Sequence, residues 1–429
     1  MSRQRYAGGA VGFAAALLYL SFPSARYNFD GVACAIAVDL ADFRHLVHGN
    51  HLVYGLVGYL WHSFWRMLGY GGPSLQSLQA LNSLLGALGA GLFVRLAVRS
   101  GGGLAAAMVG GAGLMVSRIY WTWSLEAQVY PLGAVFLIAA ATEALGERPR
   151  APYLALAHAG AMLGHVGHAM FIPVCLYALP TGKERLRYAA WLGAALAICY
   201  LIAGILFVRP DSMGDVRTWL LGSAALTLDK SFQWHGGYSL GHLRDWLRIS
   251  LTMFGAGAWA GAVFLGLAAW GAFRSWTARP KVARVAALWL AGYALLFLSW
   301  EPYTEVYRIT DLIPLWLLIA AGVPRPKKWM GGSAALAAGV LALGLWNLRD
   351  VIVPRSDPAR NSGLQRALWI ARKTPEEAWV AVDHEDQVYV PYFAHRRPLI
   401  LRYHVADRDS LSRRIEAIGA AGLPLYVVP

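Results

Sequence analysis

Apolar runs of membrane-spanning length constrain this chain more than any other feature of its sequence. A helix needs roughly 20 consecutive apolar residues to cross the hydrocarbon core of a bilayer, and such runs recur over most of the 429 residues. Charged residues make up only 14% of the chain, against about 25% in an ordinary soluble domain. The pattern predicts a mainly α, polytopic transmembrane helix bundle. It excludes a disordered chain and a disulfide-stapled secreted fold.

We expect about eleven spans in this bundle. The first is at 6–25, although this run could instead be a signal peptide ending near Ala25. The other clear spans are expected at 75–97, 103–121, 127–146, 188–208, 248–273, 283–300, 309–323 and 329–347. Two ambiguous regions decide the count. Residues 51–70 are rich in Trp and Tyr and suit a helix lying on the membrane surface, whereas 151–180 suits a hairpin of two short helices.

The distribution of Lys and Arg orients these spans. With the N-terminus inside, the inner segments hold 16 Lys and Arg but three acids, whereas the outer loops hold 10 and 11. Cytoplasmic loops carry an excess of Lys and Arg, so the net charge of +14 needs no nucleic-acid partner. We predict an integral protein of a bacterial inner membrane, with its N-terminus cytoplasmic and its C-terminus outside. Reassigning one ambiguous region would invert everything after it.

The composition changes at Arg349. Residues 349–429 hold 22 of the chain's 62 charges. Three short apolar runs follow, at 378–382, 398–402 and 423–428. A helical pattern at 410–421 precedes the last of these runs. This pattern is typical of a small α/β unit. We therefore predict a transmembrane domain, 1–348, with outer loops at 26–74 and 209–247, and a small soluble α/β domain, 349–429, on the outer face.

Ionisable groups beside apolar runs are the first candidates for a site, because charge at membrane depth is costly. Asp30 follows the first span and Glu126 follows the third. His165 and His168 lie in the expected hairpin, where a packed and a functional histidine are both open readings. The predicted topology places these groups at the outer end of the bundle. Four further polar residues are expected at the same end: His48, His51, Glu301 and Arg308. Solvated loop acids are expected at Asp39, Asp42 and Glu305.

Four short motifs, in their order along the chain, resemble those of the GT-C superfamily of polytopic glycosyltransferases. Asp30, in Phe29-Asp30-Gly31-Val32, stands where these proteins carry an essential aspartate after the first span. The run from His48 to Tyr54 resembles their His-Pro-Leu-Tyr surface helix without its proline. Leu125 to Tyr130, which contains Glu126, resembles Gln-Glu-Ala-x-x-Tyr.

The fourth motif departs further from the family pattern. Tyr307 to Pro314 resembles Arg-Tyr-x-Leu-Pro-x-x-Pro, but the aromatic residue precedes Arg308, and Asp311 replaces the first proline. The likeness covers roughly residues 6–345 and is closest to the protein O-mannosyltransferases and the aminoarabinose transferase of lipid A. Each motif is weak alone, so their order and shared membrane side carry the resemblance.

The resemblance implies transfer of a sugar from a polyprenyl-phosphate donor to a lipid, glycan or protein acceptor on the outer face. Asp30 would take the acceptor's proton, and Arg308, or else Arg118, would bind the donor phosphate. Glu126 would orient the acceptor or hold a divalent cation with Asp30. No compact metal motif occurs, so metal ligands stay unknown and no cofactor is certain. The cavity would be lined by His48, His51, Tyr54, His165, His168 and Glu301.

Two other classes stay open. A polytopic transporter or lipid flippase would also be rich in glycine, but more often shows inverted repeats and charges at mid-membrane. A non-catalytic membrane assembly factor is compatible with the departures around His51 and Arg308.

Overall fold

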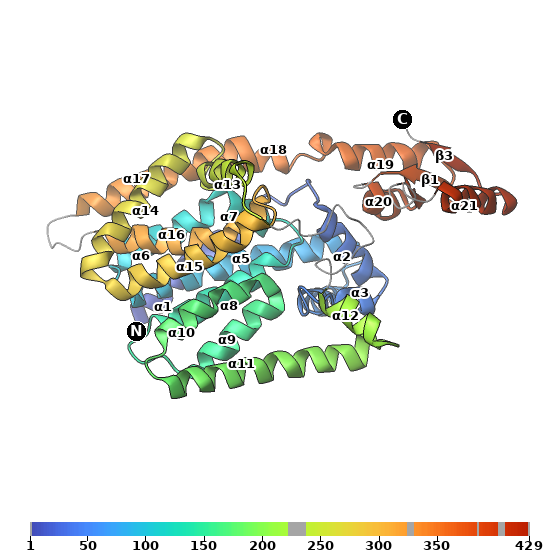
Figure 1. Cartoon of the computed structure of the whole chain (residues 1–429). Coiled ribbons are helices and arrows are strands. Elements are labelled where there is room, and N and C mark those ends of the chain that lie inside the picture. Colours follow the sequence, from blue (N-terminus) through green and yellow to red (C-terminus); the bar gives the residue numbers. More distant parts are fainter. Residues whose placement is uncertain (1, 222–236, 324–329, 384–385, 402–407, 428–429) are drawn as a thin grey trace.

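The computed structural model describes residues 2–221, 237–323, 330–383, 386–401 and 408–427 (Figure 1). Residues 222–236 of the expected outer loop and the inner cations Arg325, Lys327 and Lys328 lie outside this part. The protein is mainly helical. Its bundle contains α1 (Ser2–Ser21), α5 (Ser74–Arg99), α6 (Leu104–Val116), α7 (Arg118–Ser124), α8 (Tyr130–Ala144), α9 (Ala151–Gly164), α10 (Ile172–Ala178), α11 (Gly182–Ala203), α14 (Ala258–Ala278), α15 (Pro280–Ser299), α16 (Ile309–Gly322) and α17 (Met330–Asn347).

The bundle is that of an integral membrane protein. Within the described residues, four helices are long and apolar enough to cross a membrane: Ser74–Arg99, Gly182–Val208, Pro280–Ser299 and Gly331–Arg355. The pair α6 and α7, bent by 63°, adds a fifth. This count is below the expected eleven because several elements are short. At about 1.5 Å per residue, α8 and α9, with 15 and 14 residues, fall short of a roughly 30 Å core.

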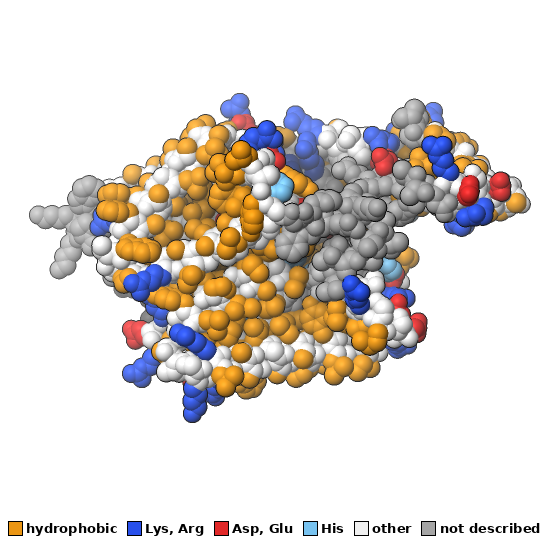
Figure 2. Space-filling model, viewed as in Figure 1, with side chains coloured by type: hydrophobic (Ala, Val, Ile, Leu, Met, Phe, Trp, Pro, Cys, Tyr) orange, Lys and Arg blue, Asp and Glu red, His pale blue; other side chains and the backbone are white. Residues whose placement is uncertain are grey.

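The surface of the bundle is largely apolar. In Figure 2 hydrophobic side chains cover most of the visible face. On α11, the exposed side chains include Ile198, Leu201 and Ile202, which are between 49% and 63% exposed. Such a face suits lipid contact, because exposed apolar area of this extent is unfavourable in water.

Connections predicted to be cytoplasmic contact one another at one end of the bundle. Lys281 Nζ donates to Gly146 O at 2.6 Å, and Arg279 Nη1 donates to Ala321 O at 2.6 Å. The N-terminus lies at this same end (Figure 1). These contacts join connections that the charge pattern places on one side of the membrane, and the side that this end faces stays a prediction.

One expected span is broken. The run 248–273 divides into α13 (Leu240–Thr252) and α14, separated by residues 253–257. The break leaves backbone carbonyl groups without helical hydrogen bonds, and the bend between α6 and α7 satisfies them. Arg118 N donates to Phe254 O at 2.9 Å, and Ile119 N donates to Met253 O at 3.1 Å. Asn347 Nδ2 joins both breaks by donating to Val116 O and Phe254 O. Broken helices are tolerated at membrane depth where neighbours satisfy the freed groups in this way.

Both ambiguous regions form helices where the sequence predicted them. Residues 151–180 fold as a hairpin of α9 and α10, with the short 3₁₀ helix η1 (Val166–Phe171) after the turn. Within 51–70, α4 (Tyr54–Met67) packs on α5, where Trp61 Nε1 donates to Ser77 O at 2.8 Å. Two further helices, α2 (Phe29–Asp39) and α3 (Phe43–Leu46), occupy what we expected to be loop.

The C-terminal unit contains a three-stranded parallel sheet of order β2-β1-β3. The strands β1 (Trp379–Val382) and β3 (Leu425–Val427) fall within the predicted apolar runs, and β2 (Arg397–Ile400) begins one residue before its run. Its helices are α19 (Ser362–Lys373), α20 (Asp386–Tyr389) and α21 (Arg408–Ala420), and the π turn η8 (Val390–Ala394) follows α20. The change of composition at Arg349 lies inside a helix, because α17 continues through η6 (Leu348–Ile352) into α18 (Val353–Arg355).

Candidate functional site

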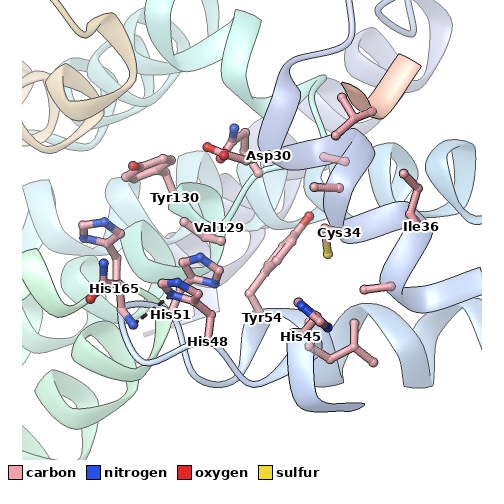
Figure 3. A pocket seen from close by; sticks show the side chains of 18 of the residues that line it. Asp30, Cys34, Ile36, His45, His48, His51, Tyr54, Val129, Tyr130 and His165 are labelled. Atoms are coloured by element: carbon pink, nitrogen blue, oxygen red, sulfur yellow. Dashed lines mark hydrogen bonds between the residues drawn. The ribbon is translucent and has the colours of Figure 1, made fainter. Parts of the chain in front are cut away.

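A cavity of about 560 Å³ opens at the end of the bundle opposite the N-terminus, between α2, α3, α4, α8 and the hairpin turn (Figure 3). Six of the ten predicted site residues line it: Asp30, His48, His51, Tyr54, His165 and Glu301. They come from four separate stretches of the chain. The arrangement therefore brings most of the predicted site into one chamber.

Asp30 belongs to the first turn of α2. Asn28 caps this helix, because its Oδ1 accepts from Gly31 N at 2.8 Å. Helix N-termini favour a carboxylate, and the position projects Asp30 toward the side of the cavity that holds Tyr130 (Figure 3). A glycine is needed at position 31, since an added Cβ would lie 2.5 Å from Ala127 O. This close approach brings α2 against the segment after α7.

Three histidines form the opposite wall. The rings of His48 and His51 stack with their centroids 4.5 Å apart. His165 packs against Tyr130 with a centroid distance of 5.0 Å, and Val166 N donates to Asn50 O at 2.8 Å, which joins the hairpin turn to the histidine loop. Burial lowers the pKa of His51 to about 3, so this imidazole is neutral at neutral pH.

Carboxylates dominate the charge of the cavity. Asp30, Asp42 and Glu301 line it, and no Lys or Arg is among the described residues that do so. The wall therefore supplies groups that accept a proton or a hydrogen bond. Within the described part of the chain, no group of three or more His, Cys, Asp or Glu could hold a metal ion.

Glu126 lies behind this chamber and does not line it. Its side chain is 1% exposed. One carboxylate oxygen, Oε1, accepts from Ser24 Oγ at 2.6 Å and pairs with Arg355 Nη2 at 3.3 Å; the other accepts from Asn28 Nδ2 at 3.4 Å. Burial raises the pKa of this carboxyl, although Arg355 and the hydrogen bonds oppose the rise.

The two arginines expected at the donor phosphate are also outside the cavity lining. Arg308 is 2% exposed; its Nε pairs with Asp311 Oδ2 at 2.7 Å, and its Nη2 donates to Ser250 Oγ at 2.7 Å. Arg118 binds both carboxylate oxygens of Glu305, at 2.9 and 3.0 Å. Both pairs involve the 3₁₀ helix η5 (Glu305–Arg308), which also supplies Tyr307 to the cavity.

His168 does not line the cavity. It is buried, and its Nδ1 is hydrogen-bonded to Tyr293 OH at 2.7 Å. The three acids read as solvated each have a structural partner. Asp39 Oδ1 accepts from Ser74 N at 3.0 Å, Asp42 caps α3, and Glu305 binds Arg118.

The sequence analysis did not select Tyr130 and Tyr307 as site residues, although both occur in the motifs it quoted. Their rings meet edge to face, 5.7 Å apart, and Tyr307 stacks on Phe297 at 4.5 Å. Both line the cavity beside Asp30 and Glu301. An aromatic residue next to a motif acid or arginine was the signal that could have identified them.

The chain shares its overall fold with two solved structures, ArnT and AglB, in line with the resemblance that the motif order predicted. No family model matches the chain, and no curated protein matches its sequence. A crystal structure of ArnT from Cupriavidus metallidurans, bound to undecaprenyl phosphate, is similar over 97% of this chain and 88% of that chain. The TM-score is 0.63 and the sequence identity 14%.

A second similar structure is the archaeal oligosaccharyltransferase AglB from Archaeoglobus fulgidus, in complex with an inhibitory peptide and a dolichol-phosphate. It matches 92% of this chain with a TM-score of 0.54 and 10% identity, and the present chain spans 64% of its length. At these identities the comparisons show a shared fold.

Proposed function

We propose that this protein is a membrane glycosyltransferase that moves a sugar from a polyprenyl-phosphate donor to an acceptor on the outer face of the membrane. The observation that carries the proposal is Asp30: a carboxylate at a helix N-terminus, directly after the first helix of the bundle, lining a 560 Å³ cavity. The fold shared with ArnT and AglB, whose structures hold polyprenyl phosphates, supports the donor class.

In the proposed reaction Asp30 accepts the proton of the acceptor's nucleophilic group as that group attacks the anomeric carbon. The bond between this carbon and the phosphate oxygen breaks, and the polyprenyl phosphate leaves with the bonding electron pair. Its phosphate is already a good leaving group, so no general acid is required. A single displacement of this kind inverts the anomeric configuration.

The donor phosphate is proposed to lie beside η5. Arg308 is the last residue of this short helix, Arg118 binds its Glu305, and the two arginines contact the end of α13 through Ser250 and Thr252. Guanidinium groups match phosphate geometry as planar forks. Asp311 and Glu305 are paired with these arginines, so a phosphate would compete with them.

In the proposed orientation, the cavity and the C-terminal unit face the outer side of the membrane. The chain would cross the membrane eleven times. Short elements such as α8, α9 and α10 would cross as parts of the bundle, packed within protein. Glu126 receives no direct role here, because it does not line the cavity and both its oxygens are bound.

A transfer assay on the full-length protein in lipid tests the proposal. Labelled polyprenyl-phosphate sugars are incubated with the wild type and with Asp30→Asn, which keeps size and polarity but removes proton acceptance. General-base catalysis contributes about 10²- to 10⁴-fold, so turnover should fall by that order while thermal unfolding is unchanged.

Asp39→Asn is the matched control. Its amide oxygen can still accept from Ser74 N, so transfer should remain near the wild-type rate. Equal turnover in Asp30→Asn and wild type, or equal losses in the two variants, would remove Asp30 as the base.

A further inference from the structure

The chain just before Asp30 is held by the C-terminal region. Ala25 N donates to Arg355 O at 2.8 Å, and Asn361 Nδ2 donates to Ala25 O at 2.7 Å. Two residues later, Tyr389 OH donates to Tyr27 O. Three backbone groups of this short stretch are therefore bound by residues more than 300 positions away in the sequence.

Apolar contacts reinforce these hydrogen bonds. The ring of Tyr27 stacks on Phe393 with a centroid distance of 5.2 Å. Buried residues of α2, including Val32 and Ala35, share one core cluster with Val388 and Tyr389 of the C-terminal unit. Val388 itself reaches the cavity lining. The C-terminal unit thus packs against the outer side of α2 and extends to the edge of the proposed site.

A buried polar group lies beneath this contact. Ser24, Asn28, Glu126, Gln128 and Arg355 form what we call the Asn28 clamp. Glu126 binds Ser24, Asn28 and Arg355, and Gln128 Nε2 donates to Asn28 Oδ1 at 2.5 Å. Both side-chain ends of Asn28 are therefore fixed from the segment that follows α7.

That segment is itself anchored to the bundle. Asn82 Nδ2, on α5, donates to the carbonyl oxygens of Glu126 and Gln128 at 2.5 and 2.6 Å. Gln79 Nε2, one turn earlier, donates to Ser24 O at 2.9 Å. The clamp therefore links α5, the start of α2 and the end of α18 in one connected set of hydrogen bonds.

We propose that the Asn28 clamp and the C-terminal unit position Asp30, and that Glu126 acts through this clamp and not on substrate. The inference rests on the proposed function of Asp30. Asn28 caps α2 by accepting from Gly31 N, and Asp30 is the second residue of that helix. A shift of Asn28 therefore moves or unwinds the turn that carries the carboxylate.

Arg355 is the part of the clamp that can be changed with least disturbance. Its side chain is 24% exposed, whereas that of Glu126 is 1% exposed. Arg355→Met leaves the carboxylate buried without its cation. A buried charge that loses its partner must take up a proton or rearrange its surroundings, and either response alters the hydrogen bonds that hold Asn28.

Steady-state transfer by the full-length protein separates positioning from substrate binding. Arg355→Met should lower kcat by about 10- to 100-fold, since a misplacement of the order of 1 Å can cost about 100-fold in rate, while KM for donor and acceptor stays within about twofold of wild type. Arg355→Lys keeps the charge and should recover most of the loss. Arg360→Met is the matched control: Arg360 pairs with exposed Asp357 at 3.4 Å, and the kcat of this variant should equal that of the wild type.

Combination with Asp30→Asn makes the test stricter. If the clamp acts through Asp30, Arg355→Met should cause little further loss once the base is removed, so the two effects are far from additive. Full additivity, or a rise in KM with kcat intact, would overturn the positioning role.

Amide hydrogen exchange provides a readout that needs no activity. In Arg355→Met, the amides of Gly31 and Val32, which donate to Asn28, should exchange at least about tenfold faster, whereas those of α5 stay protected. Unchanged exchange at Gly31 and Val32 would reject the clamp even if transfer were lost. If the wild type itself showed no transfer, faster exchange in Arg355→Met would uphold the clamp and reject the proposed function.

Discussion

Charged residues are arranged in opposite ways in two regions beside the cavity, one at α2 and the other at η5. On the α2 side, the hydrogen-bonding network lies behind Asp30 and leaves its carboxylate on the cavity surface. On the η5 side, Arg308 and Asp311 bind each other at 2.7 Å and are each 2% exposed. The first network supports the residue that we propose as the base, and in the second the charged groups bind each other.

This difference shows why residue type does not define a role. Asp30 and Asp311 are both aspartates in the first turn of a helix near the same cavity. A buried ion pair offers no group to substrate unless its partner is displaced, and breaking it is costly. The contrast can be tested by substituting single residues in each region.

The largest effect is expected on the η5 side. Arg308→Met leaves Asp311 buried without its cation, which typically costs about 3–5 kcal/mol in the free energy of unfolding. Thermal or denaturant unfolding in detergent measures this loss. Replacing both partners, as Arg308→Met with Asp311→Leu, should recover most of the stability. An Arg308→Met protein as stable as wild type would show that the η5 region does not depend on the pair of Arg308 and Asp311.

The histidine wall should respond to pH. Burial lowers the pKa of His51 to about 3 from the ordinary value of 6.5, so below pH 6.5 the unfolded chain binds a proton that the folded protein does not. Stability should therefore fall as the pH drops from about 6.5 toward 3, by at most about 1.4 kcal/mol per pH unit. His51→Asn should reduce this slope in unfolding measured between pH 7 and 5.

The smallest effect is expected at the cap of α2. Asn28→Ala removes the oxygen that accepts from Gly31 N, which typically costs about 1 kcal/mol. Asn28→Ser supplies a new capping oxygen and should restore most of the stability. Unfolding midpoints of the three proteins give the comparison, and a stability loss in Asn28→Ser as large as that in Asn28→Ala would mean that the cap is not what stabilises this turn.

Local sequence signals predicted some parts of the molecule closely. The C-terminal strands lie at apolar runs bounded by charged and polar residues, and the hairpin at His165 follows from a run too long for one helix. The charge pattern placed Asp30, His51 and Glu301 at one end of the bundle, and the structure places them around one cavity.

Long-range partners could not be predicted in this way. Glu126 faces Arg355, 229 positions away, and nothing near position 126 distinguishes a carboxylate that lines a cavity from one that meets such a partner. The break after Thr252 was missed because the groups that satisfy it come from Arg118 and Asn347. The helix α2 was missed because its cap, Asn28, was read as part of a loop.

The uninterrupted helix from α17 to α18 has a consequence for how the chain can be divided. The sequence invites a cut at Leu348, where the composition becomes polar, and such a truncation would keep every apolar run. It would also remove Arg355, Asn361 and Tyr389, and so leave a buried carboxylate and two backbone carbonyls without their donors. The continuous helix from α17 to α18 ends the bundle and carries the C-terminal unit, so any module exchanged between such proteins would have to include this helix whole.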